Sequence, residues 1–176
     1  TGYDKENPLP NLYDLAKNAG YTVTFTNEES EAITADSGKV ILIDEHLADS
    51  DAMAYELDRT EDMWSLADYV EKGIEVLDND KGFFLMVEGG KIDYACHAND
   101  AATALQEVVD FDHAIRVAYE FYLQHPKETL IIITADHETG GFTLGNGSYA
   151  LNFKALQSQQ VSQPGFSRIV NRMRHE

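Results

Sequence analysis

Carboxylate and imidazole side chains follow two apolar runs of this sequence, residues 83–87 and 129–134. The candidate cation ligands are Glu88, Asp93 and His97 after the first run, and Asp136 and His137 after the second. Carboxylate oxygens and imidazole nitrogens together suit zinc, whereas a carboxylate with water molecules suits magnesium. Two cations held in this way polarise a phosphoryl oxygen and stabilise an oxyanion near neutral pH, which is hydrolytic chemistry. The sequence therefore predicts a divalent-cation site.

The spacing within each motif bears on the geometry that such a site needs. Asp93 and His97 are four residues apart, so they share one face of a helix if the helix has begun by that point. Asp136 and His137 are adjacent, and both reach one cation only if the backbone turns sharply. The nearby Gly140–Gly141 pair makes such a turn possible, because glycine adopts conformations that other residues avoid.

Each motif alone also has an ordinary structural interpretation. Asp93 and His97 can form a pair on a helix surface. Asp136 can cap a helix beside an exposed His137, and Glu88 can be a turn carboxylate. The occurrence of both motifs at two strand ends favours a metal site, because the ordinary interpretation needs several independent coincidences.

Strand patterns alternate with helical periodicity along the chain. The strand patterns lie at residues 21–26, 40–43, 83–87 and 129–134, and the helical patterns at 9–16, 65–77 and from about 95 or 97 to 123. This order is typical of a mostly parallel sheet covered by helices on both faces, so the expected fold class is α/β. The carboxyl ends of parallel strands meet at one edge of a sheet, which places the two motifs close together.

The rest of the chain carries weaker signals. Residues 1–176 are expected to form a single α/β domain, in which the C-terminal segment 142–176 is weakly defined. Within that segment Asn146–Gly147 suggests a hairpin turn, and residues 153–161 and 166–173 suggest short helices.

Composition narrows the classes of partner. Lys and Arg number 13 against 31 Asp and Glu, a net charge of −18, so nucleic acid and anionic membrane surfaces are not expected partners. No apolar run approaches the roughly 20 residues that span a bilayer. Hydrophobic residues make up 43% and charged residues 25%, as in globular domains.

Cys96 is the only cysteine, which excludes an intramolecular disulfide, and it is expected to be a packed residue and not a ligand.

The motifs resemble those of a known family. The stretch Gly82–Asp93 with His97–Ala101 resembles the metal-binding core of alkaline phosphatases, and Thr134–Gly141 is similar to their second metal motif. Tyr55–Arg59 and the helix predicted after it match the family's usual order, so the resemblance covers roughly residues 12–141. It implies an α/β/α sandwich and a phosphomonoesterase that uses zinc and magnesium.

The resemblance also implies a role for each candidate ligand. Asp93 and His97 resemble two ligands of one zinc, Asp136 and His137 resemble two ligands of the other, and Glu88 resembles the magnesium carboxylate. The family's nucleophilic serine and phosphate-binding arginine have no match in this sequence and are expected upstream of it. The chain is therefore expected to be the C-terminal part of a larger catalytic domain, inactive alone, with no catalytic residue assigned within it.

Several functional expectations follow from the resemblance. The parent protein is expected to hydrolyse phosphate monoesters through a phosphoserine intermediate, in the periplasm or after secretion, with a homodimer as one expected assembly. The alternatives are a phosphodiesterase, sulfatase or phosphomutase of the wider superfamily, and a non-catalytic acidic module that binds divalent cations. The Glu-Gly-Gly-Lys-Ile-Asp sequence at residues 88–93 favours the phosphatase.

Overall fold

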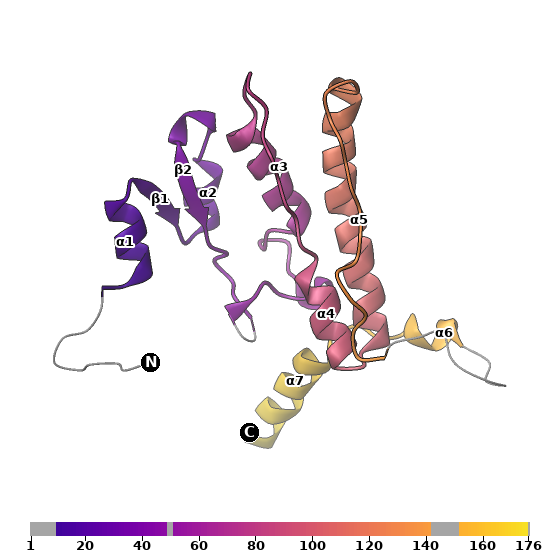
Figure 1. The fold of residues 1–176 in the computed structure, drawn as a ribbon. Coiled ribbons are helices and arrows are strands. Elements are labelled where there is room, and N and C mark those ends of the chain that lie inside the picture. Colours follow the sequence, from indigo (N-terminus) through magenta and orange to yellow (C-terminus); the bar gives the residue numbers. More distant parts are fainter. Residues whose placement is uncertain (1–9, 49–50, 142–151, 176) are drawn as a thin grey trace.

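A computed structural model describes residues 10–48, 51–141 and 152–175 of the chain. The helices are α1 (Leu12–Asn18), α2 (Asn27–Glu31), α3 (Leu66–Leu77), α4 (Gly90–His97), α5 (Ala101–Gln124), α6 (Phe153–Leu156) and α7 (Gln163–His175). The described residues also form the short 3-10 helices η1 (Ala35–Ser37) and η3 (Glu56–Asp58) and the strands β1 (Tyr21–Thr24) and β2 (Lys39–Leu42). Figure 1 shows α3 and α5 standing side by side, with α4 near their base. No helix in these described ranges combines the length and apolar character needed to cross a membrane.

The two strands form a small parallel sheet. β1 pairs with β2 from Tyr21 opposite Lys39 to Thr24 opposite Leu42. Helix α1 packs beside β1, and α2 lies between the two strands in the sequence (Figure 1). The strands predicted at 21–26 and 40–43 are therefore confirmed, and so is the α/β fold class.

The strands predicted at 83–87 and 129–134 take a different form. Both segments are extended, but neither has a strand partner among the residues that the structure describes. Along 83–87 the side chains alternate, with Leu85 turned inward and Phe84 and Met86 exposed. The sequence here is a continuous apolar run, and the inward side chains pack on helices: Leu85 lies beside Gly73 of α3, and the ring centres of Phe83 and Phe121 of α5 are 5.6 Å apart. A ladder of hydrogen bonds also needs a neighbouring strand.

The helix predicted from about residue 95 or 97 to 123 is interrupted, because α4 ends at His97 and α5 begins at Ala101. The break lies at Asn99, whose φ of 53° is left-handed and ends α4. The Asp100 side chain then caps α5 by accepting hydrogen bonds from the N–H of Thr103 at 3.3 Å and from its hydroxyl at 2.7 Å.

Residues 55–59 form a short turn that contacts α4, α5 and α7. We call it the 55–59 turn. Tyr55 packs with Ala95 of α4 and Ala104 of α5 in a small apolar core. The Arg59 guanidinium binds the buried Asp110 carboxylate, with 2.7 Å between Nη2 and Oδ1. One short stretch of chain therefore contacts α4, which carries Asp93 and His97, and α5, which follows it.

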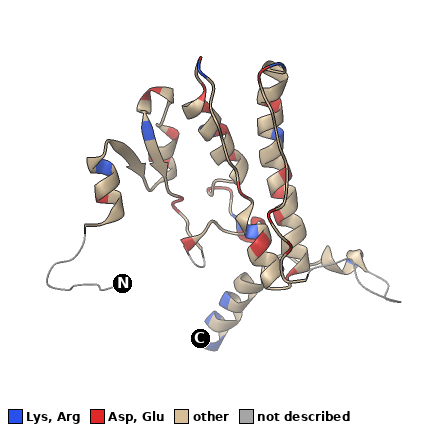
Figure 2. Ribbon diagram, in the orientation of Figure 1, with Lys and Arg blue, Asp and Glu red and all other residues tan. Residues whose placement is uncertain are grey.

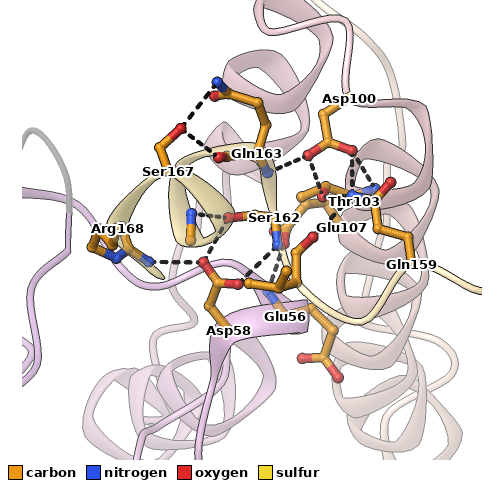
Figure 3. Close-up of polar contacts among 12 residues, drawn as sticks. Glu56, Asp58, Asp100, Thr103, Glu107, Gln159, Ser162, Gln163, Ser167 and Arg168 are labelled. Carbon is orange, nitrogen blue, oxygen red and sulfur yellow. Dashed lines mark hydrogen bonds and ion pairs between the residues drawn. The ribbon is translucent and has the colours of Figure 1, made fainter. Parts of the chain in front are cut away.

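The same turn anchors the C-terminal segment. Asp58 accepts hydrogen bonds from the N–H of Ser162 at 2.9 Å and from its hydroxyl at 2.6 Å, and it pairs with Arg168 at 2.9 Å (Figure 3). Asp100 accepts from the N–H of Gln163 at 2.7 Å and from the Gln159 amide at 2.7 Å. Burial acts to raise the pKa of Asp100, but these hydrogen bonds outweigh it and the pKa is lowered.

The outcome for the segment after Gly141 is mixed. The helix predicted at 166–173 is part of the longer α7, and only Phe153–Leu156 of the helix predicted at 153–161 is helical. The hairpin turn predicted at 146–147 lies outside the described residues. Figure 2 shows acidic residues on most elements and a group of basic residues on α7, where Arg168, Arg172 and Arg174 lie.

The alternation along 83–87 gives a test of the packing. Leu85→Ala is expected to lower the free energy of unfolding by about 1–2 kcal/mol, because Leu85 Cδ1 lies 3.7 Å from the position of a Cβ at Gly73 of α3. The neighbouring Met86 is 79% exposed, so Met86→Ala is expected to change that free energy by less than about 0.5 kcal/mol. Urea denaturation measures both values, and equal losses would contradict the inward position of Leu85.

Candidate metal centre

Helix α4 presents Asp93 and His97, two of the three candidate ligands of the first motif, on one face. Asp93 Oδ2 and His97 Nε2 lie 3.5 Å apart, one helical turn from each other. Gly89 precedes this helix at a tight contact, because a Cβ there would lie 3.0 Å from Ile92 Cδ1 and 3.2 Å from the Phe111 ring of α5. The prediction that Asp93 and His97 share a helix face is confirmed by this geometry.

The second motif turns its two adjacent donors to the same side. The N–H of His137 donates to Asp136 Oδ1 at 3.0 Å, and His137 Nε2 lies 3.4 Å from Asp136 Oδ2. The other ring nitrogen, Nδ1, lies 2.8 Å from the carbonyl oxygen of Glu138. The sequence predicted that a sharp bend was needed here, and local hydrogen bonds hold the chain in it.

Thr139 links the two motifs. Its hydroxyl donates to Asp93 Oδ1 at 2.5 Å and lies 3.2 Å from His137 Nδ1. Gly140 follows with a φ of 64°, and a Cβ there would overlap the carbonyl oxygen of Cys96 in α4. Thr139 is absent from the site residues predicted from the sequence, because its partner Asp93 is 46 positions away and no local pattern indicates the contact.

Glu88 lies apart from these donors. It lines a cavity of about 260 Å³ together with Arg59, Lys91, Tyr94 and Glu107, among others. Within the described part of the chain, no three His, Cys, Asp or Glu side chains converge as a metal-binding group. The structure therefore brings together Asp93, His97, Asp136 and His137 as two pairs of donors, and it places Glu88 on the cavity side.

Two ionisable groups of the site have shifted pKa values. The hydrogen bond to the Glu138 carbonyl raises the pKa of His137, and the nearby Asp136 carboxylate adds to that effect. Burial raises the pKa of the Cys96 thiol, with a further contribution from Asp93. Cys96 is thus disfavoured as a thiolate.

Comparisons with known proteins decide the family. The family model described as alkaline phosphatase matches residues 9–170. The chain belongs to the alkaline phosphatase family. It is 43% identical over 136 residues to alkaline phosphatase 4 of Bacillus subtilis (strain 168), across 77% of this chain and 28% of that protein. It is 42% identical over 125 residues to the tissue-nonspecific isozyme of Gallus gallus, across 67% of this chain and 23% of that protein.

A solved structure agrees with the family match. The crystal structure of a cold-active alkaline phosphatase from a psychrophile, Shewanella sp., matches with a TM-score of 0.72 and 32% identity. The match covers 91% of this chain and 37% of that one. The resemblance stated from the motifs is therefore confirmed, and the chain spans less than a third of the length of the two curated relatives.

The electrostatics of the second motif can be tested directly. Asp136→Asn removes the negative charge beside His137 and is expected to lower the pKa of that imidazole, because the protonated ring loses a favourable neighbour. An NMR titration of the His137 ring in metal-free protein measures the change. An unchanged or higher pKa in the variant would contradict the contribution assigned to Asp136.

Proposed function

We propose that the parent protein hydrolyses phosphate monoesters at a centre of zinc and magnesium, and that this chain supplies part of that centre. One observation carries the proposal: the Thr139 hydroxyl joins Asp93 of the first motif to His137 of the second. Family membership supports the reaction class, and the donor types support the metals, since imidazole with carboxylate suits zinc.

The donor sets fit such a centre by their chemistry. Asp93 and His97 would hold one zinc, Asp136 and His137 the other, and Glu88 the magnesium. When bound, the cations supply Lewis-acid stabilisation of charge on the phosphoryl and leaving oxygens. The chain's own part is to orient its donors: Thr139 directs one oxygen of Asp93, and α4 keeps His97 one turn away.

Three finer features belong to the same proposal. The reaction proceeds through a phosphoserine intermediate, with the nucleophilic serine and the phosphate-binding arginine in a part of the parent protein that precedes this chain. With two donors for each zinc, this chain binds metal more weakly than a complete site, because water replaces each missing ligand. The parent acts in the periplasm or after secretion, where homologues of this kind are often found.

The alternatives differ in what they predict. The family match over residues 9–170 favours monoester hydrolysis over the phosphodiesterase, sulfatase and phosphomutase alternatives. A non-catalytic acidic module would bind cations through its overall charge of −18, without preference for the two motifs. Residue-specific metal binding therefore separates the proposed function from that module.

Zinc affinity tests the residue assignment. His97→Ala and His137→Ala are each expected to weaken Zn²⁺ binding to the metal-free chain by about 10-fold or more, because each removes one of two protein donors. Calorimetric titration of Zn²⁺ into the folded variants measures the change.

His113→Ala is the matched control, because His113 is an exposed histidine of α5 away from both motifs. The control is expected to bind Zn²⁺ as the unsubstituted chain does. Equal affinities in all variants would support the acidic module and overturn the assignment.

Activity of the chain alone tests the missing nucleophile. Supplied with Zn²⁺ and Mg²⁺ at alkaline pH, the chain is expected to show no turnover of an aryl phosphate at about 1 s⁻¹ or faster, a typical enzyme rate. Turnover at such a rate that a chelator abolishes would mean that a nucleophile lies within these residues.

A further inference from the structure

Glu107 is a buried carboxyl group outside the candidate metal centre. It lies on α5, is 6% exposed, and accepts a hydrogen bond from the backbone N–H of Glu56 at 2.7 Å. Figure 3 shows Glu107 and Glu56 where α5 meets the 55–59 turn. A buried carboxylate is costly unless other groups compensate its charge, so its neighbours indicate what it does.

Charged groups from three elements surround Glu107. Arg59 of the 55–59 turn binds Asp110 of α5 through both of its terminal nitrogens and also binds the Glu56 carboxylate. Lys91, from the first turn of α4, is a second cation that acts on Glu107. Glu107 therefore lies between the turn and the beginning of α4, with Arg59 and Lys91 as its cations.

The 55–59 turn contacts α4 directly. Tyr55 is 6% exposed and packs against Ala95, in the middle of α4. The Lys91 ammonium lies 3.8 Å from the centre of the Tyr55 ring, a close cation–π contact. A displacement of the turn would thus shift the first turn of α4, where Asp93 lies.

The cavity connects this arrangement with the candidate magnesium carboxylate. Glu107 and Lys91 line it together with Glu88, Gly89 and Gly90. The segment that leads from Glu88 into α4 therefore borders the same space as the Glu107 carboxyl group.

We propose that Glu107 is a positioning residue of the metal centre, whose carboxylate fixes the 55–59 turn and Lys91 and, through them, the first turn of α4 with Asp93. The inference rests on the proposed function for the identity of the cation site. It adds a residue that is not among the proposed ligands and acts through the orientation of α4.

The ionisation of Glu107 supplies a readout. Burial raises the pKa of Glu107 to about 7; Asp110 adds to the rise, while the Glu56 hydrogen bond, Arg59 and Lys91 oppose it. The carboxylate is present above that pH and is lost as the pH falls below it. Because the pKa is raised, the ionised form disfavours folding, and this group's contribution to stability decreases as the pH rises from its ordinary pKa to about 7.

Glu107→Gln separates positioning from stability. The amide keeps an acceptor for the Glu56 N–H and removes the charge, so the variant is expected to unfold at the same temperature as the wild type, or higher, at pH 8.5. Its Zn²⁺ affinity at pH 8.5 is nevertheless expected to be about 10-fold weaker, a typical loss for a group that orients metal ligands. A purely structural role would not combine these two results.

The experiment is a Zn²⁺ titration of metal-free wild type and variant at pH 8.5 and pH 6.0. Protonation of the histidine ligands weakens Zn²⁺ binding equally in both proteins, so this effect cancels in the ratio of wild-type to variant affinity. The ratio is expected to approach 1 at pH 6.0, where the wild-type carboxyl group is neutral. Glu120→Gln, at an exposed position of the same helix, is the matched control, with an expected ratio of 1 at both pH values.

Each other outcome overturns the inference. A ratio of 1 at pH 8.5, or a loss that is equal at both pH values, removes the positioning role and leaves the proposed function intact. Failure of the folded wild type to bind Zn²⁺ removes both. If the Gln variant does not fold, Lys91→Gln gives the same test, because it removes the α4 cation that Glu107 acts on, and an unchanged affinity at pH 8.5 then overturns the proposal.

Discussion

Nearly buried carboxylates hold the helices of this protein together. Asp110 binds Arg59, Glu107 binds the Glu56 backbone, and Asp58 binds Ser162 and Arg168. Removing one partner of a buried ion pair such as Arg59 and Asp110 costs about 3–5 kcal/mol, so this pair resists separation of the 55–59 turn from α5. Since three such contacts converge on the 55–59 turn, the relative positions of α4, α5 and α7 depend on that turn.

This arrangement explains how a small apolar core can support a metal site. The core that joins the turn to α4 and α5 consists of Tyr55, Ala95 and Ala104, with Cys96 packed against it. Alanine at the α4–α5 contact allows a close approach of the two helices, and charged groups around it supply the remaining specificity. Helix α4 is thereby held with Asp93 on the Thr139 hydroxyl and with His97 beside Asp93 on the same face.

Local features of the sequence predicted much of the fold and the site. The apolar runs at β1 and β2 and the Asp93–His97 spacing needed only short-range periodicity, and the structure agrees with them. The apolar periodicity did not predict the break at Asn99, because this periodicity continues across the break while one left-handed residue redirects the chain. Thr139 and Glu107 act through residues 46 and 51 positions away in sequence, and no local pattern predicts such pairs.

Hydrogen exchange in Arg59→Met measures whether the 55–59 turn holds these helices in place. We expect faster exchange of backbone amides in α4, the first half of α5 and the start of α7 together, with unchanged protection of the Ile43 N–H, which donates to Thr24 beside the β1–β2 sheet. Faster exchange confined to residues 55–59, or equal acceleration in the sheet, would contradict the dependence of the three helices on the turn.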